Sequence, residues 1–151
     1  MLTKSIFFTI FLWSHLSAQN VEYLQSESFK QTNMPFSEAV RVGNLFFLSG
    51  QIGEVYTDIP GETKLVAGGI KPETRQTMEN IKSVLERNGL SLDNVVKCTC
   101  MLADISEWAE MSKEYIKFFP KNKPARSAFA GTGLAMGARV EIECIATVNE
   151  D

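Results

Sequence analysis

Two helical segments, each enclosed by strand-like segments, restrict the possible fold of this chain more than any other feature of its sequence. The first begins at Pro72, which suits the first turn of a helix, and ends at Gly89, which suits a helix C-terminus. Its apolar residues Met78, Ile81 and Leu85 recur at helical spacing and form one stripe. Such a stripe predicts that the helix packs one face against the core.

The second helical segment opens at Asp104 with the pattern of a capping box and stops before Pro120. Its stripe consists of Trp108, Met111 and Tyr115, which are again spaced to lie on one side of a helix. We interpret both stripes as core, because an apolar face at helical spacing is more often core than a cofactor site.

Strand-like segments complete the order. Residues 39–42 and 45–48 flank Gly43-Asn44 and predict a hairpin, and residues 21–32 are expected to hold a first strand with a polar connection. Residues 53–69 contain four glycines and a proline, so we expect a loop there. Three further strands are expected at residues 94–102, 126–131 and 138–148.

This order predicts one α+β domain. Each helix lies between two strands, and right-handed crossovers then place both helices on one face of a mixed sheet. The 151 residues are enough for one such domain. Because the strands carry apolar residues on both sides, the other sheet face also needs cover, and association with further copies is the natural way to supply it.

A candidate site lies in the C-terminal third of the chain. Arg126 follows a proline and an alanine, Glu141 lies fifteen residues later, and residues 128–136 between them carry no charge. The planar guanidinium of an arginine holds a carboxylate through two parallel hydrogen bonds, and a glutamate can position or activate a water. The pattern predicts a site for a small carboxylate, with a structural Arg–Glu pair between two strands as the alternative.

Composition argues against several chemistries. His15 is the only histidine, so the rest of the chain has no Ser-His or Cys-His nucleophile pair and no histidine-bound metal. Cys98, Cys100 and Cys144 form no Cys-x-x-Cys pair, so we expect buried free thiols and no metal, with a bridge from Cys144 as the alternative. The net charge of −3 offers no basic surface for nucleic acid.

The N-terminus has the pattern of a secretory signal peptide. A positive start at Lys4 precedes an apolar run over residues 5–13, and the segment 1–18 ends in small residues at Ala18. We expect cleavage after Ala18, which leaves residues 19–151 as a single secreted or periplasmic domain without stable membrane association. The alternatives are an uncleaved anchor and a misassigned start codon, the latter with a cytoplasmic protein.

Several segments resemble the Rid (YjgF/YER057c-type) family, whose best-known members are reactive-imine deaminases. The resemblance extends over about residues 33–148, and its specific part is Pro124-Ala125-Arg126-Ser127 together with Val140-Glu141-Ile142-Glu143. The other segments that carry it are residues 47–52, 74–81 and 94–97.

The resemblance implies a chorismate-mutase-like (YjgF-like) fold, a homotrimer and active sites in the clefts between subunits. It also implies hydrolysis of 2-imino acids or their enamine tautomers to 2-oxo acids and ammonia, without a cofactor. Arg126 then binds the substrate carboxylate, Glu141 positions the water, and Ser49 and Gly50 line the pocket. Ser127 belongs with them, because a backbone carbonyl after Arg126 can steady the charge of an iminium.

Three further substrate-binding candidates depart from the family pattern. Phe36 stands where the family has a tyrosine, Ala128 where it has a cysteine, and Ser112 where it has an asparagine. Each change removes or shortens a polar group beside the substrate, so these three positions bear on the substrate range.

Two rival functions follow from the same residues. One is a non-catalytic or chaperone-like trimer whose pocket binds a small carboxylate, which Phe36 and Ser112 favour. Glu141 favours the enzyme, because a second carboxylate beside an anion site weakens simple anion binding. The other rival is an endoribonuclease, an activity claimed for some family members, and the acidic charge balance argues against it.

Overall fold

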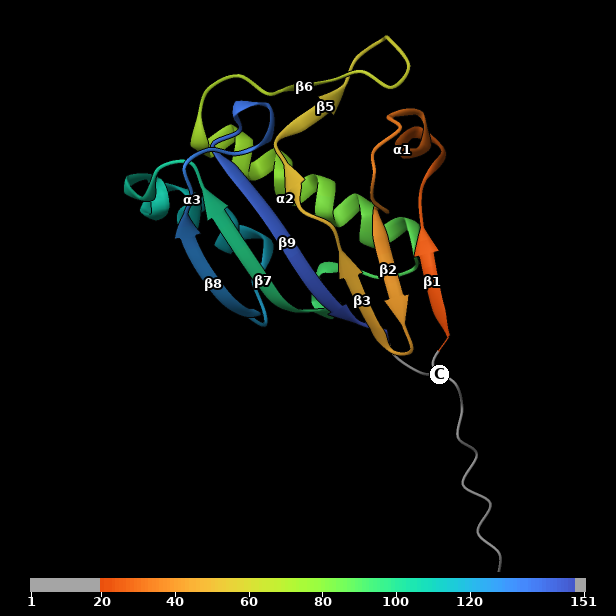
Figure 1. The fold of residues 1–151 in the computed structure, drawn as a ribbon. Coiled ribbons are helices and arrows are strands. Elements are labelled where there is room, and N and C mark those ends of the chain that lie inside the picture. The colour runs from red at the N-terminus through yellow and green to blue at the C-terminus, as the bar shows by residue number, and fades with distance from the viewer. Residues whose placement is uncertain (1–19, 149–151) are drawn as a thin grey trace, which may run out of the picture.

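The computed structural model describes residues 20–148 and shows a mixed sheet with two helices on one face (Figure 1). The strand order is β1-β2-β3-β9-β7-β8, and the short β4 also pairs with β9. Only β7 and β8 run parallel. The strands are β1 (Val21–Leu24), β2 (Ala39–Val42), β3 (Leu45–Leu48), β4 (Gln51–Ile52), β5 (Glu54–Tyr56), β6 (Thr63–Leu65), β7 (Val95–Leu102), β8 (Ala125–Ala130) and β9 (Val140–Thr147). The helices are α1 (Glu27–Gln31), α2 (Ile70–Arg87) and α3 (Trp108–Tyr115).

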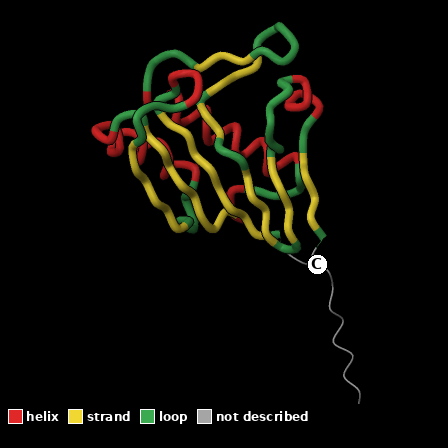
Figure 2. The backbone as a smooth tube through the Cα atoms, viewed as in Figure 1, coloured by secondary structure: helices red, strands yellow, loops and turns green. Residues whose placement is uncertain are grey.

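Helix α2 covers the middle of the sheet and confirms the first predicted helix (Figure 2). It begins at Ile70, two residues before the predicted start, and ends at Arg87. Met78, Ile81 and Leu85 have no exposed surface, as their spacing predicted. Burial of these three side chains stabilises the fold by roughly 1.5–3 kcal/mol each.

Helix α3 confirms the second predicted helix with one exception. A short turn precedes it, in which the Asp104 side chain accepts a hydrogen bond from the Ser106 nitrogen at 2.9 Å. Met111 and Tyr115 are buried, whereas Trp108 is 45% exposed, so its assignment to the core was wrong. The helical spacing predicts correctly that Trp108 lies on the same side of α3 as Met111 and Tyr115. Trp108 is the first residue of the helix, however, and lies at the rim of the core.

Two segments fold differently from the sequence-based expectation. Residues 53–69 are not a loop throughout, because β5 and β6 form a separate hairpin in which the Thr63 hydroxyl donates to Glu54 at 2.6 Å. In residues 21–32 the expected first strand is β1, but the connection after it contains an unexpected helix, α1, where the Ser26 hydroxyl accepts from the Phe29 nitrogen at 3.2 Å. These elements have three to five residues, too few to show a hydrophobic period.

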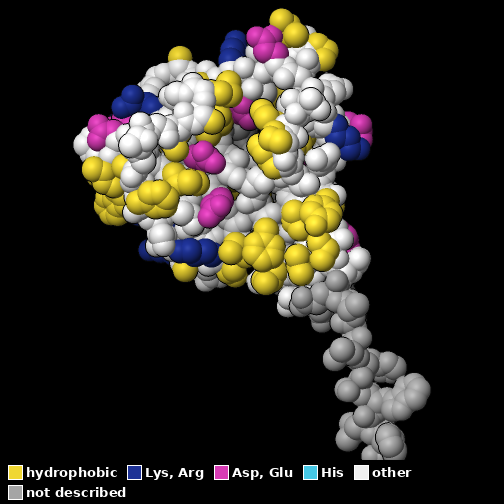
Figure 3. Space-filling model, in the orientation of Figure 1, with side chains coloured by type: hydrophobic (Ala, Val, Ile, Leu, Met, Phe, Trp, Pro, Cys, Tyr) yellow, Lys and Arg dark blue, Asp and Glu magenta, His cyan; other side chains and the backbone are white. Residues whose placement is uncertain are grey.

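The sheet face opposite α2 and α3 is rich in exposed apolar side chains. In β3, Phe46 and Leu48 are buried under the helices, whereas Leu45 and Phe47 point the other way and are each 38% exposed. Figure 3 shows hydrophobic side chains gathered over part of this face. We call it the open face; its large exposed apolar residues are Val21, Tyr23, Leu45, Phe47 and Phe129. An apolar surface of this kind is typical of an interface between proteins.

The three cysteines are buried free thiols, as predicted. Cys98 and Cys144 are cross-strand partners on β7 and β9. Burial raises the pKa of the Cys100 thiol to about 12, so this thiol remains protonated and unreactive.

The predicted signal peptide, residues 1–18, lies outside the described residues. Within residues 20–148, no helix is both long and apolar enough to cross a membrane.

Candidate active site

Glu141 lies near the start of β9, on the open face. Its neighbours Val140 and Ile142 are fully buried under the helices, and strand alternation therefore directs Glu141 to the opposite side. The β4 residue Ile52 and the β7 residue Met101 are its cross-strand partners. Glu141 is thus held by a strand with paired neighbours on both sides, where the backbone has little freedom.

The backbone of Gly50 packs directly on the Glu141 carboxylate. A Cβ atom at position 50 would lie 2.0 Å from the Glu141 Oε1 atom, far inside any allowed contact. Glycine is required here because the close approach leaves no room for a side chain. The contact places Gly50 beside Glu141.

The surroundings of Glu141 disfavour its charged form. Burial, and secondly the nearby charge of Glu143, raise the pKa of the Glu141 carboxyl above its ordinary value. A carboxyl with a raised pKa can both give and take a proton closer to neutral pH, as general acid–base catalysis requires.

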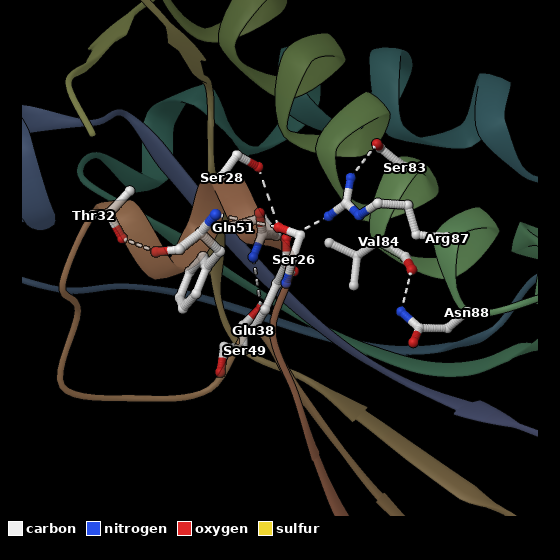
Figure 4. Close-up of polar contacts among 11 residues, drawn as sticks. Ser26, Ser28, Thr32, Glu38, Ser49, Gln51, Ser83, Val84, Arg87 and Asn88 are labelled. Atoms are coloured by element: carbon white, nitrogen blue, oxygen red, sulfur yellow. Dashed lines mark hydrogen bonds and ion pairs between the residues drawn. The ribbon is translucent and has the colours of Figure 1, made fainter. Parts of the chain in front are cut away.

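Ser49 fixes the turn that carries Gly50. Its backbone nitrogen donates to the backbone carbonyl oxygen of Glu38 at 3.1 Å, and its hydroxyl donates to the backbone carbonyl oxygen of Ser37 at 2.7 Å. The hydroxyl proton is therefore used within the fold, and the lone pairs of the oxygen remain for a ligand. The side-chain carboxylate of Glu38 in turn accepts hydrogen bonds from the Ser26 backbone nitrogen and from Arg87 of α2 (Figure 4).

Phe36 lies in the same region as Gly50. Both line a cavity of about 90 Å³ between the residues around α1, the β5–β6 hairpin and α2. The Phe36 ring packs against Phe29 with 5.7 Å between ring centroids, and 46% of Phe36 is exposed. We call Glu141, Gly50, Ser49 and Phe36 together the Glu141 half-site.

Arg126 lies on the other face of the sheet. In the parallel pair β7–β8 it is the partner of the buried Cys98, so its side chain points toward the helices. Its guanidinium carbon lies 5.4 Å from the ring centroid of Trp108 and 5.0 Å from that of Tyr115, both on α3. Two aromatic faces hold the cation by cation–π attraction, which leaves its hydrogen-bond donors available.

The alternative of a structural Arg–Glu pair is wrong for this chain. Glu141 and Arg126 point to opposite faces of the sheet, and neither makes a salt bridge with any residue in 20–148. An arginine held by aromatic rings and without a carboxylate partner is suited to bind an external anion.

A cavity of about 430 Å³ opens beside Arg126. Ser112 and Tyr115 of α3 contribute to its lining, and the buried hydroxyl group of Ser112 has no hydrogen-bond partner within the described part of the chain. A buried hydroxyl without a partner is rare, and a ligand or ordered water is the usual explanation. We call Arg126, Trp108, Tyr115 and Ser112 together the Arg126 half-site.

The remaining two predicted site residues on β8 are divided by strand alternation. Ala128 pairs with the buried Cys100 and so lies on the helix face, as Arg126 does. Ser127 lies on the open face, where its hydroxyl accepts a hydrogen bond from Lys97 Nζ at 2.8 Å. The Ser127 side chain therefore does not join the Arg126 half-site.

Sequence reasoning missed the aromatic residues that hold Arg126. Trp108 and Tyr115 were assigned to the core because they fit the helical stripe, yet both rings also face the guanidinium. No signal in the sequence marked this contact, because it depends on how α3 packs beside β8. Among residues 20–148, no cluster of three His, Cys, Asp or Glu side chains is placed to hold a metal ion.

Comparison with known proteins identifies the relatives of the chain. A family model described as Endoribonuclease L-PSP matches residues 8–148. The human 2-iminobutanoate/2-iminopropanoate deaminase is 38% identical over 112 residues, which cover 74% of this chain and 79% of the human protein. The chloroplastic Reactive Intermediate Deaminase A of Arabidopsis thaliana is 36% identical over 135 residues, which cover 88% of this chain and 70% of the plant protein.

Solved structures share the fold. The crystal structure of RidA from the Antarctic bacterium Psychrobacter sp. PAMC 21119 superposes with a TM-score of 0.68 at 36% identity, and the match covers 76% of this chain and 89% of that chain. The mixed sheet with helices on one face is therefore the fold of this group of proteins.

Proposed function

The chain belongs to the Endoribonuclease L-PSP family, to which the Rid (YjgF) proteins belong, and on that premise we propose that it is a hydrolytic deaminase of 2-imino acids and enamines. Relatives that carry deaminase names are 36–39% identical, which supports a deaminase rather than an endoribonuclease. The reaction adds one water to the C=N bond and yields a 2-oxo acid and ammonia. It requires neither a metal nor an organic cofactor, because the imine carbon is already electrophilic.

Arg126 binds the substrate carboxylate in this proposal. A bidentate guanidinium–carboxylate contact fixes the imine carbon in place, which makes the attack of water effectively unimolecular. The two aromatic rings at 5.0 and 5.4 Å keep the guanidinium plane oriented without consuming its N–H groups.

Glu141 handles the water and the protons. As a carboxylate it accepts a proton from the attacking water, and as the carboxylic acid it returns that proton to the nitrogen, which leaves as ammonia. The raised pKa of its carboxyl supports this double use.

The single observation that carries the proposal is that Arg126 and Glu141 lie on opposite faces of one sheet. One chain therefore holds two half-sites that do not face each other. We infer that the protein assembles as a homotrimer in which the Arg126 half-site of one subunit meets the Glu141 half-site of the next. The apolar open face supports such an assembly, because a ring of copies would cover it.

The test measures 2-oxo-acid and ammonia release from imines that an amino-acid oxidase generates in situ. Wild-type protein should accelerate release, and Arg126→Ala and Glu141→Ala should each abolish it. When the two variants are unfolded and refolded together, about one quarter of wild-type activity should return, because a quarter of randomly mixed interfaces regain both residues.

Three other outcomes contradict specific parts of the proposal. No activity in the mixture would show that each subunit carries its own complete site. A molar mass other than that of a trimer, measured by light scattering, would contradict the assembly. No acceleration with any imine, from a folded trimer, would favour a non-catalytic protein that binds small carboxylates.

We also propose that residues 1–18 direct export and that residues 19–151 act outside the cytoplasm. The intact mass of the protein purified from its native host decides this: loss of 18 residues supports export, and a full-length chain contradicts it.

A further inference from the structure

The cavity beside Arg126 carries more positive charge than one carboxylate requires. Lys113 of α3 and Lys123 of the segment before β8 line it together with Arg126. Its remaining lining residues are uncharged: Ser112, Tyr115, Ile116 and Pro124. Three cationic side chains therefore surround one cavity of about 430 Å³ that has no acidic lining residue.

The two lysines are not engaged elsewhere in the described chain. Lys117 pairs with Glu114 at 2.8 Å, and Lys121 pairs with Asp93 at 3.0 Å, so the neighbouring lysines have acidic partners. Within residues 20–148, neither Lys113 nor Lys123 makes a salt bridge or a side-chain hydrogen bond. Cations gathered without counter-charges in a concave site attract an anion.

The cavity also has uncharged lining residues. Ser112 and Tyr115 of α3 contribute to it. Ile116 and Pro124 add an apolar wall of a size suited to a short aliphatic segment. The lining thus combines one bidentate anion site, an apolar stretch and two further cations.

We propose that the preferred substrates are 2-imino acids whose side chain ends in a second carboxylate. This inference rests on the proposed deaminase function and names the substrate class of the same site. Arg126 binds the carboxylate next to the imine carbon, and Lys113 and Lys123 bind the distal carboxylate. The chemistry is unchanged: one water enters, ammonia leaves, and the product is a 2-oxo dicarboxylate.

The experiment compares kcat/KM for the imine of aspartate with that for the imine of alanine, each generated in situ by a matching oxidase. Wild-type protein should prefer the dicarboxylate. Lys113→Gln and Lys123→Gln should each lower the ratio of the two kcat/KM values about threefold to fivefold, as expected for partly exposed ion pairs. The double variant should lower it about tenfold or more, and Lys123→Glu should reverse the preference.

The matched control is Lys121→Gln, which removes the same charge two residues from Lys123 but from a lysine that pairs with Asp93. It should leave the ratio unchanged. A binding measurement makes the same comparison without catalysis. Calorimetry should show that wild-type protein binds 2-oxosuccinate, a dicarboxylate, more tightly than 2-oxopropanoate. The Lys113→Gln and Lys123→Gln variants should lose that difference in affinity.

The outcomes separate this inference from the proposed function. Equal or better turnover of the alanine imine, with a ratio that the lysine variants do not change, overturns the dicarboxylate preference and leaves the deaminase standing. Absence of turnover with both imines contradicts the deaminase, and the calorimetric comparison then decides whether the cavity still selects dicarboxylates.

Discussion

The two half-sites are built in different ways. Glu141 lies on an inner strand, β9, with paired neighbours on both sides, and the backbone of Gly50 closes on its carboxylate. Arg126 lies on β8 at the edge of the sheet, and side chains of α3 hold it. Backbone geometry thus fixes the group proposed to handle the water, whereas side chains of a helix surround the group proposed to bind the substrate. The first region is suited to one chemical step, and the second can adapt to different substrates.

Among changes that leave Arg126 and Glu141 in place, substitution at Gly50 should have the largest effect, because the Glu141 half-site has no room for a further side chain. A Cβ atom in Gly50→Ala would lie 2.0 Å from the Glu141 Oε1 atom and must displace the carboxylate. We expect kcat/KM to fall about a hundredfold, since a displacement of about 1 Å can cost that much. Steady-state kinetics with an oxidase-generated imine measures the loss.

Gly133→Ala is the matched control, because a Cβ atom at that position meets no atom within 4 Å. It should retain the activity and the melting temperature of the wild type. If the kcat/KM of Gly50→Ala stays within a few-fold of the wild-type value, the Glu141 half-site tolerates change as well as the Arg126 half-site does. The contrast between the two half-sites would then be wrong.

Changes around Arg126 should have graded effects. In Trp108→Ala the guanidinium loses one of its two aromatic neighbours but keeps Tyr115. We expect KM to rise about twofold to fivefold with little change in kcat, since a cation–π contact at an exposed site contributes about 0.5–1 kcal/mol. Trp108→Phe should restore most of the loss. A fall in kcat at constant KM would instead assign Trp108 to the chemical step.

The smallest expected effect is on stability and distinguishes a functional carboxyl from a structural one. Because the folded protein raises the pKa of Glu141, it binds that proton more tightly than the unfolded chain, and stability falls as pH rises through this range. Glu141→Gln removes this dependence. At pH 7 the free energy of unfolding should therefore increase, by less than about 1 kcal/mol.

Below about pH 4 the stability gained by Glu141→Gln over the wild type should disappear, because the wild-type glutamate is then largely protonated in both the folded and the unfolded state. Urea unfolding curves at the two pH values provide the measurement. A variant that is less stable than the wild type at pH 7 would show that the charged carboxylate supports the fold.

Much of the fold was predictable from the sequence. The stripe of Met78, Ile81 and Leu85 located α2, and Gly43-Asn44 located the β2–β3 hairpin, because both patterns are local and strong. The hairpin β5–β6 and helix α1 were missed, since elements of three to five residues are specified by single hydrogen bonds, such as that from Thr63 to Glu54, rather than by a period.

The candidate site was predictable in its residues but not in its arrangement. Arg126 and Glu141 stand out by their chemistry because the residues 128–136 between them carry no charge. The face to which each side chain points depends on the alternation and pairing of two separate strands, and a shift of one residue reverses it. That Arg126 pairs with Cys98, and so points toward the helices, follows only from the parallel register of β7 and β8.

The sheet separates the side chains of Arg126 and Glu141, which project from its opposite faces. No rotation of a side chain brings the Arg126 guanidinium and the Glu141 carboxylate together across a continuous hydrogen-bonded layer. In the proposed function, a single chain is therefore inactive, and catalysis begins only when copies of the chain associate. Dilution that dissociates the proposed trimer would then abolish activity, so the concentration of the protein would set the number of complete sites.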